Sequence, residues 1–177
     1  MAKVSIIIPV YNVEEYIHQA LDSVVNQTLK DIEIICVNDC TSDKSFEIVK
    51  EYACKDTRFN LLEMPFNQGQ GVARNKAIET ASANYIMFLD PDDWLELDAC
   101  AKAYKQISEN NNDFVFFNLY KYSQVDNTKT LSNILAYLEP VKNISNLDLK
   151  TVNADWFRTC WSCRAIYSKD FLNRNNK

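Results

Sequence analysis

Short apolar runs alternate with stretches of helical periodicity over the first 120 residues of the chain. β-Branched and aromatic residues predict five strands, at 4–10, 32–37, 59–64, 85–89 and 113–120. Between them, apolar residues that recur every three or four positions predict helices at 13–25, 44–53, 72–81 and 95–109. This alternation predicts an α/β fold with a mainly parallel sheet, flanked by helices and built with right-handed crossovers.

The run at 85–89 carries no charge and then ends abruptly in Asp90, Pro91, Asp92 and Asp93. An uncharged run predicts a strand buried on both faces, and ligands of open α/β sheets bind beyond the carboxyl ends of such strands. Side chains alternate along a strand, so Asp90 and Asp92 point to the same side. Carboxylates this close repel one another unless a cation lies between them, which predicts Mg²⁺ or Mn²⁺ bridging a diphosphate. The alternative is a polar turn in which Asp92 or Asp93 caps a helix that begins near Leu95.

Both glycines of the protein, Gly69 and Gly71, stand in one loop. In a chain with so few glycines, this placement predicts a backbone with positive φ or a backbone that something approaches closely. The helix that follows carries Arg74 and Asn75 in its first turn, and a helix N-terminus with an arginine is a site for a phosphate group. The alternative is an ordinary glycine turn with a solvated arginine.

Composition narrows the classes of function. At 177 residues the length fits one domain with a sizeable core. The net charge of −5 and the pI near 4.9 argue against a nucleic-acid groove, which needs clustered Lys and Arg. No apolar run approaches the ~20 residues of a membrane span, and the N-terminus lacks the pattern of a signal peptide. The sequence thus predicts a cytoplasmic protein without a transmembrane segment, and leaves peripheral association with a membrane open.

The six cysteines predict reduced thiols, because no export signal precedes them. Four lie in apolar segments and are expected to be mostly buried: Cys36, Cys40, Cys54 and Cys100. Cys160 and Cys163 could form a redox pair or half of a zinc site, although no second close pair follows them. His18 is the single histidine and is predicted at the surface, which argues against catalysis by a histidine-dependent triad.

Four loops are predicted to converge at one edge of the sheet, at 9–14, 38–43, 69–75 and 90–93. There Tyr11 offers a ring for a base, Asp39 a carboxylate for a base or ribose, and Arg74 a charge for phosphate. Each has a structural alternative. Tyr11 could simply pack, Asp39 could cap its turn, and Glu14 could offset the dipole of the helix that follows. Asn12 is also a plausible cap for that helix.

The chain resembles family 2 glycosyltransferases in the order and spacing of four motifs, and the resemblance covers residues 3–110. The motifs are Val4-Ser-Ile-Ile-Ile-Pro-Val-Tyr-Asn12, Val37-Asn-Asp39-Cys-Thr-Ser42-Asp43, Asn67-x-Gly69-x-x-x-Ala73-Arg74-Asn75 and Phe88-Leu-Asp90-Pro-Asp92-Asp93. The resemblance implies a GT-A (Rossmann-like) fold, a nucleotide-sugar donor that is commonly a UDP-sugar, and Mg²⁺ or Mn²⁺. It also implies transfer with inversion to a hydroxyl of a saccharide or lipid-linked saccharide, in the synthesis of bacterial-type surface polysaccharide or another glycan.

The resemblance also implies a role for each matching residue. Pro9, Tyr11 and Asn12 would line the nucleoside pocket, with Glu14 beside it. Asp39 would hold the base, Arg74 would lie near the base or phosphates, Asp90 would face the ribose or sugar, and Asp92 would bind the metal.

Residues 1–120 are expected to form the nucleotide-sugar-binding core, and 121–177 the start of an acceptor-side region that ends early. A short helix is predicted near 131–138 and a helical start at 168–172. The resembling enzymes carry their general base beyond the position of Lys177, and the nearby carboxylates are Asp155 and Asp170, the latter a predicted helix cap. This chain alone is expected to bind a nucleotide-sugar and to transfer slowly or not at all. The alternative is a non-catalytic module that docks a nucleotide-sugar or a partner.

Overall fold

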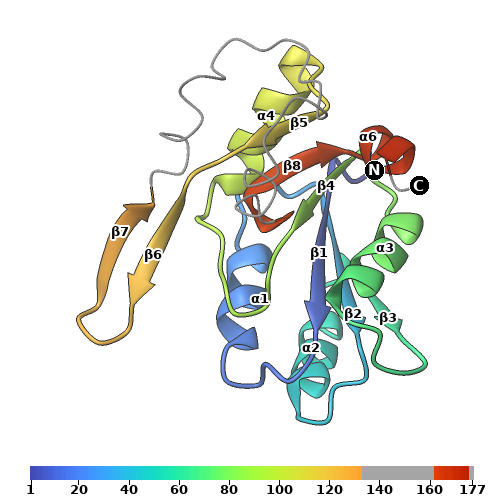
Figure 1. The fold of residues 1–177 in the computed structure, drawn as a ribbon, viewed down its shortest axis with the longest axis vertical. Coiled ribbons are helices and arrows are strands. Elements are labelled where there is room, and N and C mark those ends of the chain that lie inside the picture. Colours follow the sequence, from blue (N-terminus) through green and yellow to red (C-terminus); the bar gives the residue numbers. More distant parts are fainter. Residues whose placement is uncertain (133–161, 176–177) are drawn as a thin grey trace. The chain divides into compact units, whose positions relative to one another are not determined.

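Four of the predicted strands form the parallel part of one sheet (Figure 1). They are β1 (Val4–Val10), β2 (Ile32–Asn38), β3 (Phe59–Glu63) and β4 (Tyr85–Phe88). In this computed structural model, which describes residues 1–132 and 162–175, β1 pairs in parallel with both β2 and β4, and β2 with β3. Every residue of β1 is buried, as expected for an apolar strand with neighbours on both sides. The prediction of an α/β fold with a mainly parallel sheet is confirmed.

The sheet has six strands in the order β3-β2-β1-β4-β8-β5. Strand β8 (Ala165–Ser168) pairs antiparallel with β4, and β5 (Phe114–Phe116) lies next to β8. The prediction of one strand over 113–120 was wrong, because β5 ends at Phe116 and a new strand begins at Leu119. Residues 165–175 therefore return to the sheet, although the sequence had grouped them with the region after residue 120.

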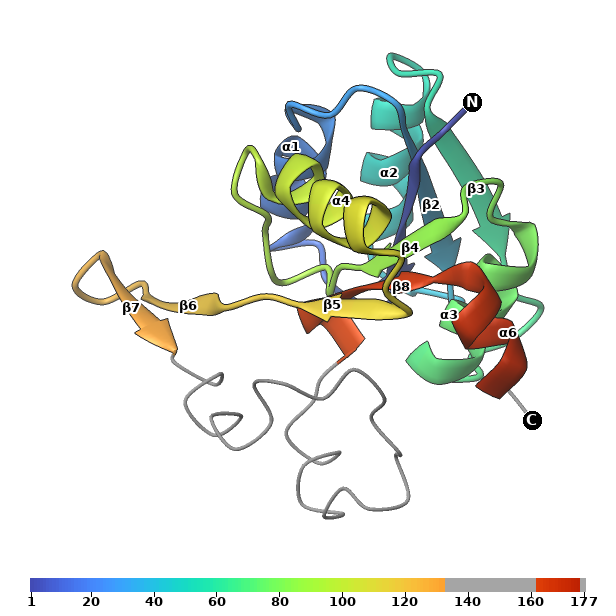
Figure 2. The same cartoon turned by 90° about the horizontal axis from the view of Figure 1, so that it is seen from above.

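The described residues belong to two compact units, whereas the length had predicted one domain. Of the described residues, the first unit comprises 1–115 and 165–175 and holds the sheet, and the second comprises 116–132 and 162–164. In the first unit, α1 (Ile17–Val25), α2 (Ser45–Ala53) and α4 (Ala99–Asn110) cover one face of the sheet, and α3 (Gln70–Thr80) and α6 (Lys169–Asn175) lie on the other (Figure 2).

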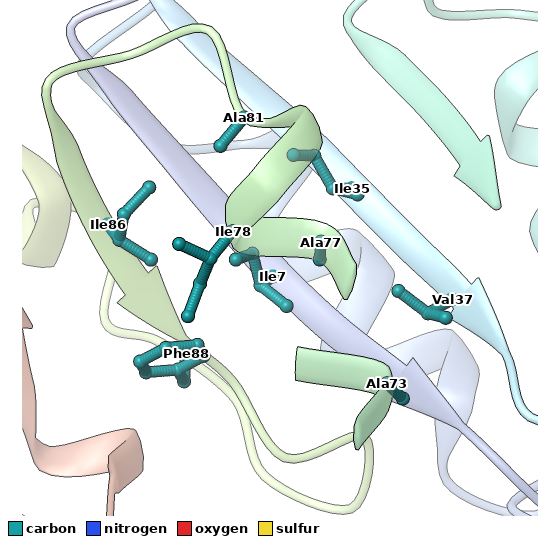
Figure 3. Close-up of a cluster of buried hydrophobic side chains, with 9 residues drawn as sticks. All are labelled: Ile7, Ile35, Val37, Ala73, Ala77, Ile78, Ala81, Ile86 and Phe88. Carbon is teal, nitrogen blue, oxygen red and sulfur yellow. The ribbon is translucent and has the colours of Figure 1, made fainter. Parts of the chain in front are cut away.

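Small residues bring α3 close to the strands (Figure 3). Ala73, Ala77 and Ile78 pack there with side chains from three strands, among them Ile7 and Ile86, in one buried cluster. Alanines at the contact let the helix backbone approach the sheet, and the cluster excludes water along the helix. This packing fixes the first turn of α3 near the carboxyl ends of β1 and β4.

In the second unit, β6 (Leu119–Ser123) and β7 (Thr128–Ser132) form an antiparallel hairpin, and η2 (Ser162–Arg164) is a 3-10 turn. Asn127 has a φ of 61° in the hairpin turn and accepts a hydrogen bond from the Tyr122 hydroxyl. The helix predicted near 131–138 is wrong for its first two residues, which belong to β7, and its remainder lies outside the described residues. Asp155 and Cys160 lie outside them as well.

Two helices begin later than predicted. Helix α1 starts at Ile17 and not at 13, and Asn12 is not its cap: Asn12 has a φ of 51°, and Tyr16 stands at the cap position. Helix α4 starts at Ala99, four residues after the predicted start, so Leu97 lies in the preceding loop with 58% of its surface exposed. None of the described helices has the length and apolar character needed to cross a bilayer.

The thiols fit the prediction in part. All five described cysteines are free, and burial raises the pKa of the Cys36 and Cys100 thiols, that of Cys100 to about 12. Cys40 and Cys54 are exposed, so the expectation of burial was wrong for these two. His18 lies at the surface as predicted, where its Nδ1 is 3.3 Å from the Tyr52 hydroxyl.

Candidate active site

An ion pair joins α3 to the end of β4. Arg74 Nη2 donates to Asp90 Oδ1 at close range and to Gln70 Oε1 at 2.9 Å. The guanidinium carbon lies 5.8 Å from the centre of the Phe88 ring. The Arg74 and Asp90 side chains are only 14% and 22% exposed, so the pair is poorly screened by water and fixes one helix against one strand.

The guanidinium of Arg74 retains unused donor capacity. Its Nε is buried, and no acceptor for it is found in the part of the chain that the structure describes. A buried donor without an acceptor costs about 1–3 kcal/mol, which a ligand that accepts a hydrogen bond from Nε would recover. An arginine that approaches carboxylates and phosphates with a planar fork of donors suits an anionic ligand.

The acidic tip, residues Asp90, Pro91, Asp92 and Asp93, follows directly after β4. The Leu89 N–H donates to the Ile7 carbonyl at 3.0 Å, and the Asp93 N–H to the Asp90 carbonyl at 3.0 Å, which closes a tight turn. The Asp92 carboxylate is exposed, and neither a hydrogen bond nor an ion pair is found for it among residues 1–132 and 162–175. Because α4 begins only at Ala99, with Asp98 at its cap position, neither Asp92 nor Asp93 caps this helix.

The acidic tip fits a divalent cation. Its exposed carboxylate oxygens are hard ligands of the kind that Mg²⁺ and Mn²⁺ prefer, and such ions are held by one or two carboxylates together with waters and phosphate oxygens. Asp90 is already paired with Arg74, so Asp92 is the carboxylate with free acceptor capacity. That Asp92 binds the metal stays a prediction.

Asp39 fixes the turn that opens α3. Its side chain is nearly buried, with 3% of the residue exposed, and its two carboxylate oxygens accept the Gln68 and Gly69 N–H groups, each at 2.8 Å. Gly69 has a φ of 84°, as the glycine pattern predicted. Asp39 thus caps the turn of another loop and not its own, a role that the sequence did not indicate.

The space beside the first turn of α3 is open. A Cβ atom built on Gly69 or Gly71 would meet no atom within 4 Å. The N–H groups of a first helical turn have no partner within the helix, and they attract anions together with the helix dipole. Gly71 leaves that backbone accessible, one turn of helix before the Arg74 side chain.

A polar latch, residues Asn12, Glu14, Thr41, Ser42, Asp43 and Ser45, ties the loop after β1 to the loop after β2. Asn12 Oδ1 accepts from the Ser42 N–H at 3.0 Å, and Asp43 Oδ2 accepts from the Glu14 N–H at 3.0 Å. Glu14 Oε2 in turn accepts from the Lys44 N–H at 3.1 Å. Asn12 and Glu14 therefore hold the two loops together, and a role for them in a nucleoside pocket stays a prediction.

The centre of the latch is the Asp43 carboxylate. Its partial burial opposes ionisation, but hydrogen bonds from the side chains of Ser45 and Thr41 and the backbone of Ser45 and Glu14 outweigh this effect and hold the pKa of Asp43 at about 2. The Thr41 hydroxyl lies 2.7 Å from Asp43 Oδ1. Asp43 is thus a fully hydrogen-bonded anion at neutral pH.

The remaining candidates lie at the carboxyl end of β1. Pro9 is buried opposite Val37, and the pairing with β4 ends at Ile7 and Phe88. Along a strand, the backbone groups of residues two apart point to the same neighbouring strand, so Pro9, like Ile7, faces β4. The pairing with β4 has ended before Pro9, so the N–H that proline lacks costs the sheet no hydrogen bond. Tyr11 follows with 47% of its surface exposed, which leaves its ring accessible.

Sequence reasoning missed several partners of the site. Gln70 and Phe88 both contact Arg74, and the spacing of four between Gln70 and Arg74 on one helix was the available signal. The polar latch gave no such signal, because its bonds join residues about thirty positions apart. Of the predicted residues, Arg74 and Asp90 are in direct contact, and Asp39 reaches the α3 turn.

Comparison with known proteins shows where this arrangement recurs. The sequence profile of Glycosyl transferase family 2 matches residues 5–174 of the chain. The chain is 36% identical over 174 residues to an uncharacterized glycosyltransferase, EpsJ, of Bacillus subtilis, in a match that covers 98% of the chain and 50% of EpsJ. It spans half or less of the length of the curated relatives that it matches.

Two solved structures share the fold. S. aureus TarS in complex with UDP superposes with a TM-score of 0.74 at 24% identity, over 98% of this chain and 49% of the TarS chain. The mannosyltransferase PcManGT from Pyrobaculum calidifontis, in complex with GDP-Man and Mn²⁺, superposes with a TM-score of 0.68 at 19% identity, over 97% of this chain and 46% of the PcManGT chain. At these identities the likeness shows a common fold.

Proposed function

The chain belongs to glycosyltransferase family 2 and has the GT-A fold, and from this premise we propose that it binds a nucleotide-sugar, first of all a UDP-sugar, for transfer to an acceptor hydroxyl. The donor would lie at the carboxyl edge of β1, β2 and β4, beside Mg²⁺ or Mn²⁺. TarS with bound UDP and PcManGT with bound GDP-Man and Mn²⁺ support this proposal by their common fold.

One observation carries the proposal. Arg74 and Asp90 form a poorly exposed ion pair at the carboxyl edge of the sheet, and the next carboxylate along the chain, Asp92, is exposed and without a partner among the described residues. A cation and an anion side by side, with an unused carboxylate next to them, match what a sugar diphosphate and its metal require.

The roles of the residues follow from their places. Tyr11 would stack on the base, and Asp39 would hold the base edge with the acceptor capacity that Gln68 and Gly69 leave free. Arg74 would face the base or phosphates, Asp90 the ribose or sugar, and Asp92 would bind the metal. Pro9, Asn12 and Glu14 would shape the nucleoside side of the pocket.

The leaving group of the transfer is a nucleoside diphosphate, whose negative charge grows as the glycosidic bond breaks. A bound divalent cation neutralises that charge. The N-terminus of α3 and Arg74 add positive potential on the protein side. Transfer with inversion requires a direct displacement by an acceptor hydroxyl, activated by a carboxylate acting as general base.

The acceptor would be a saccharide or a lipid-linked saccharide. Joining a sugar to such a hydroxyl extends a glycan by one residue, which places the reaction in the assembly of a bacterial-type surface polysaccharide or another glycan. Catalysis would take place in the cytoplasm, where nucleotide-sugars are made.

Binding of donor and metal can be tested together. Thermal-shift measurements with UDP-, GDP- and TDP-sugars, with and without Mn²⁺, should show stabilisation by one nucleotide class that increases with the metal, because a ligand that binds only the folded state stabilises it by mass action. Hydrolysis of the preferred donor to free nucleotide should require Mn²⁺ and be lost in Asp92→Ala. Equal stabilisation by nucleotide in wild type and Asp92→Ala, with no effect of Mn²⁺, would contradict the proposal.

A further inference from the structure

A buried glutamine lies outside the four motifs of the site, between the first and the second. Gln27 follows the end of α1 and is fully buried, at 0% exposure. Buried glutamine is uncommon because each unsatisfied amide group costs free energy, so a buried amide needs partners for both ends.

Its partners lie on α1, on the loop that carries the acidic tip, and at the start of α4. Gln27 Nε2 donates to the Ser23 carbonyl at 2.9 Å and to the Glu96 carbonyl at 2.8 Å. Its Oε1 accepts from the Cys100 N–H at 3.0 Å. The amide thereby uses both donors and joins the last turn of α1 to the segment between the acidic tip and α4.

Two further hydrogen bonds support the same segment. The Leu95 N–H donates to the Ser23 hydroxyl at 3.1 Å, and the Thr28 N–H donates to the Leu97 carbonyl at 2.9 Å. Residues 95–97 and Cys100 are therefore held on α1 and the residues that follow it. At the other end of the loop, the Leu89 N–H is bonded to Ile7 of β1.

The loop is thus fixed at both ends, with Asp92 between them. Asp92 is three positions from Leu89 on one side and three from Leu95 on the other. Such a short span transmits the position of the Leu95 anchor to the Asp92 backbone, and metal affinity depends strongly on how ligands are oriented by the residues behind them.

We propose that Gln27 is a positioning residue that acts through the loop of residues 90–98 to hold Asp92 in place for a divalent cation and the diphosphate of the donor. The inference rests on the proposed function, since it assigns Asp92 the role of metal ligand. Gln27 itself touches neither metal nor donor.

Two variants remove the anchor to different degrees. Gln27→Met keeps a long unbranched side chain but removes all three hydrogen bonds of the amide. Ser23→Ala leaves those three in place and removes the acceptor of the Leu95 N–H, together with the bond from the Ser23 hydroxyl to the Ala20 carbonyl. Ile35→Val is the matched control: Ile35 is equally buried, but it packs with α3 on the opposite face of the sheet. If Gln27→Met fails to fold, Ser23→Ala carries the test.

The first readout is amide hydrogen exchange without any ligand. Exchange of the Leu95 and Cys100 amides should increase at least about tenfold in Gln27→Met, and that of Leu95 alone in Ser23→Ala, because exchange follows local opening. Ile35→Val should leave both amides as in wild type even where it lowers the melting temperature.

The second readout is the affinity for Mn²⁺ in the presence of UDP, measured by titration calorimetry. Gln27→Met should weaken it by about 10- to 100-fold, the range seen when residues that orient metal ligands are lost, with a smaller loss in Ser23→Ala. Wild-type affinity in both variants, despite faster exchange of the loop, would overturn the positioning role. A wild-type protein without Mn²⁺-dependent UDP binding would instead refute the proposed function, and the positioning of a metal ligand with it.

Discussion

Two polar clusters lie at the same edge of the sheet and differ in how many of their polar groups have hydrogen-bond partners within the protein. In the polar latch, the Asp43 carboxylate accepts bonds from two hydroxyls and two backbone N–H groups, and its pKa falls to about 2. At the acidic tip, Asp92 has no partner among the described residues, and the Nε donor of Arg74 has none either. The latch pairs the Asp43 carboxylate within the protein, whereas the acidic tip and Arg74 keep groups that a ligand could pair with.

The difference separates scaffold from site. Buried polar groups are normally paired within the protein, and a buried group left unpaired near a cluster of open carboxylates is available to a ligand. The sequence alone does not separate residues that hold the loops from residues that bind a ligand. Asn12, Glu14 and Asp43 are as polar as Asp92 and stand in similar loops after strands. The comparison predicts loss of binding without loss of stability at the acidic tip, and the reverse at the latch.

The largest effect is expected at Asp92. Asp92→Asn keeps the size of the side chain but removes its charge, and should reduce Mn²⁺-dependent release of UDP from a UDP-sugar by about 100-fold or more. Because the carboxylate has no hydrogen bond or ion pair with any residue that the structure describes, the melting temperature should change by less than about 2 °C. Steady-state kinetics and calorimetry on one preparation check both parts. Asp31→Asn, at an exposed carboxylate 3.1 Å from Lys3, is the matched control and should alter neither.

A mixed effect is expected at Arg74, which belongs to both sides of the comparison. Arg74→Met removes the ion pair with Asp90 and leaves that half-buried carboxylate unpaired, which should lower the free energy of unfolding by about 1–3 kcal/mol. Affinity for UDP should fall by about tenfold or more, because the guanidinium donors are lost. Urea denaturation and UDP titration measure the two effects. Unchanged UDP affinity in the folded variant would remove Arg74 from the donor site.

The two glycines are also expected to differ, with Gly69 affecting stability and Gly71 affecting binding. Gly69→Ala places a side chain at a φ of 84° and should destabilise the protein by about 1 kcal/mol. Gly71→Ala lies within α3, where alanine is the better helix former, and should leave stability unchanged or raise it by up to about 1 kcal/mol. Its methyl group would occupy the open space beside the first turn, so affinity for UDP should still decrease. Equal UDP affinity in Gly71→Ala and wild type would show that the donor does not approach this backbone.

The smallest effect on binding is expected at the latch. Asp43→Asn should destabilise the protein at pH 7 by about 1 kcal/mol, less than the full pKa shift implies because water reaches the carboxylate. Since the folded-state pKa is depressed from 3.8 to about 2, this stabilisation is present above about pH 4 and is lost as the pH falls toward 2. Urea denaturation of both proteins between pH 7 and pH 3 should show their difference shrinking with acid, while UDP affinity at pH 7 stays within about twofold. A large loss of UDP affinity would show that Asp43 contributes to donor binding and not only to holding the two loops together.

The sequence was sufficient wherever local pattern decides the structure. Apolar runs gave β1, β2, β3 and β4 because a strand with neighbours on both sides must be apolar on both faces. The paired glycines indicated a positive φ, which Gly69 has. The motifs located the carboxyl edge of the sheet and the contact between the Arg74 loop and the Asp90 loop, since carboxyl ends of parallel strands meet at one edge.

Contacts between residues far apart in the sequence were not predictable. Strand β8 enters the sheet beside β4 from some eighty positions away, and no local pattern encodes that pairing. Residues 95–98 have helical spacing, yet hydrogen bonds to Ser23, Gln27 and Thr28 hold them as a loop. Asn12 has the composition of a helix cap, but its side chain bonds to the loop after β2. In each case a tertiary contact overrode a local preference.

The central claim is that the unpaired carboxylate at the end of β4 binds a cation that holds the diphosphate of a nucleotide-sugar. A crystal structure with UDP and Mn²⁺ tests it most directly, with the anomalous signal of manganese used to locate the ion. The account predicts an anomalous peak within coordination distance of the Asp92 carboxylate, bridged to diphosphate oxygens, with the Tyr11 ring against the base. Bound UDP elsewhere, or manganese with no contact to Asp92, would contradict it.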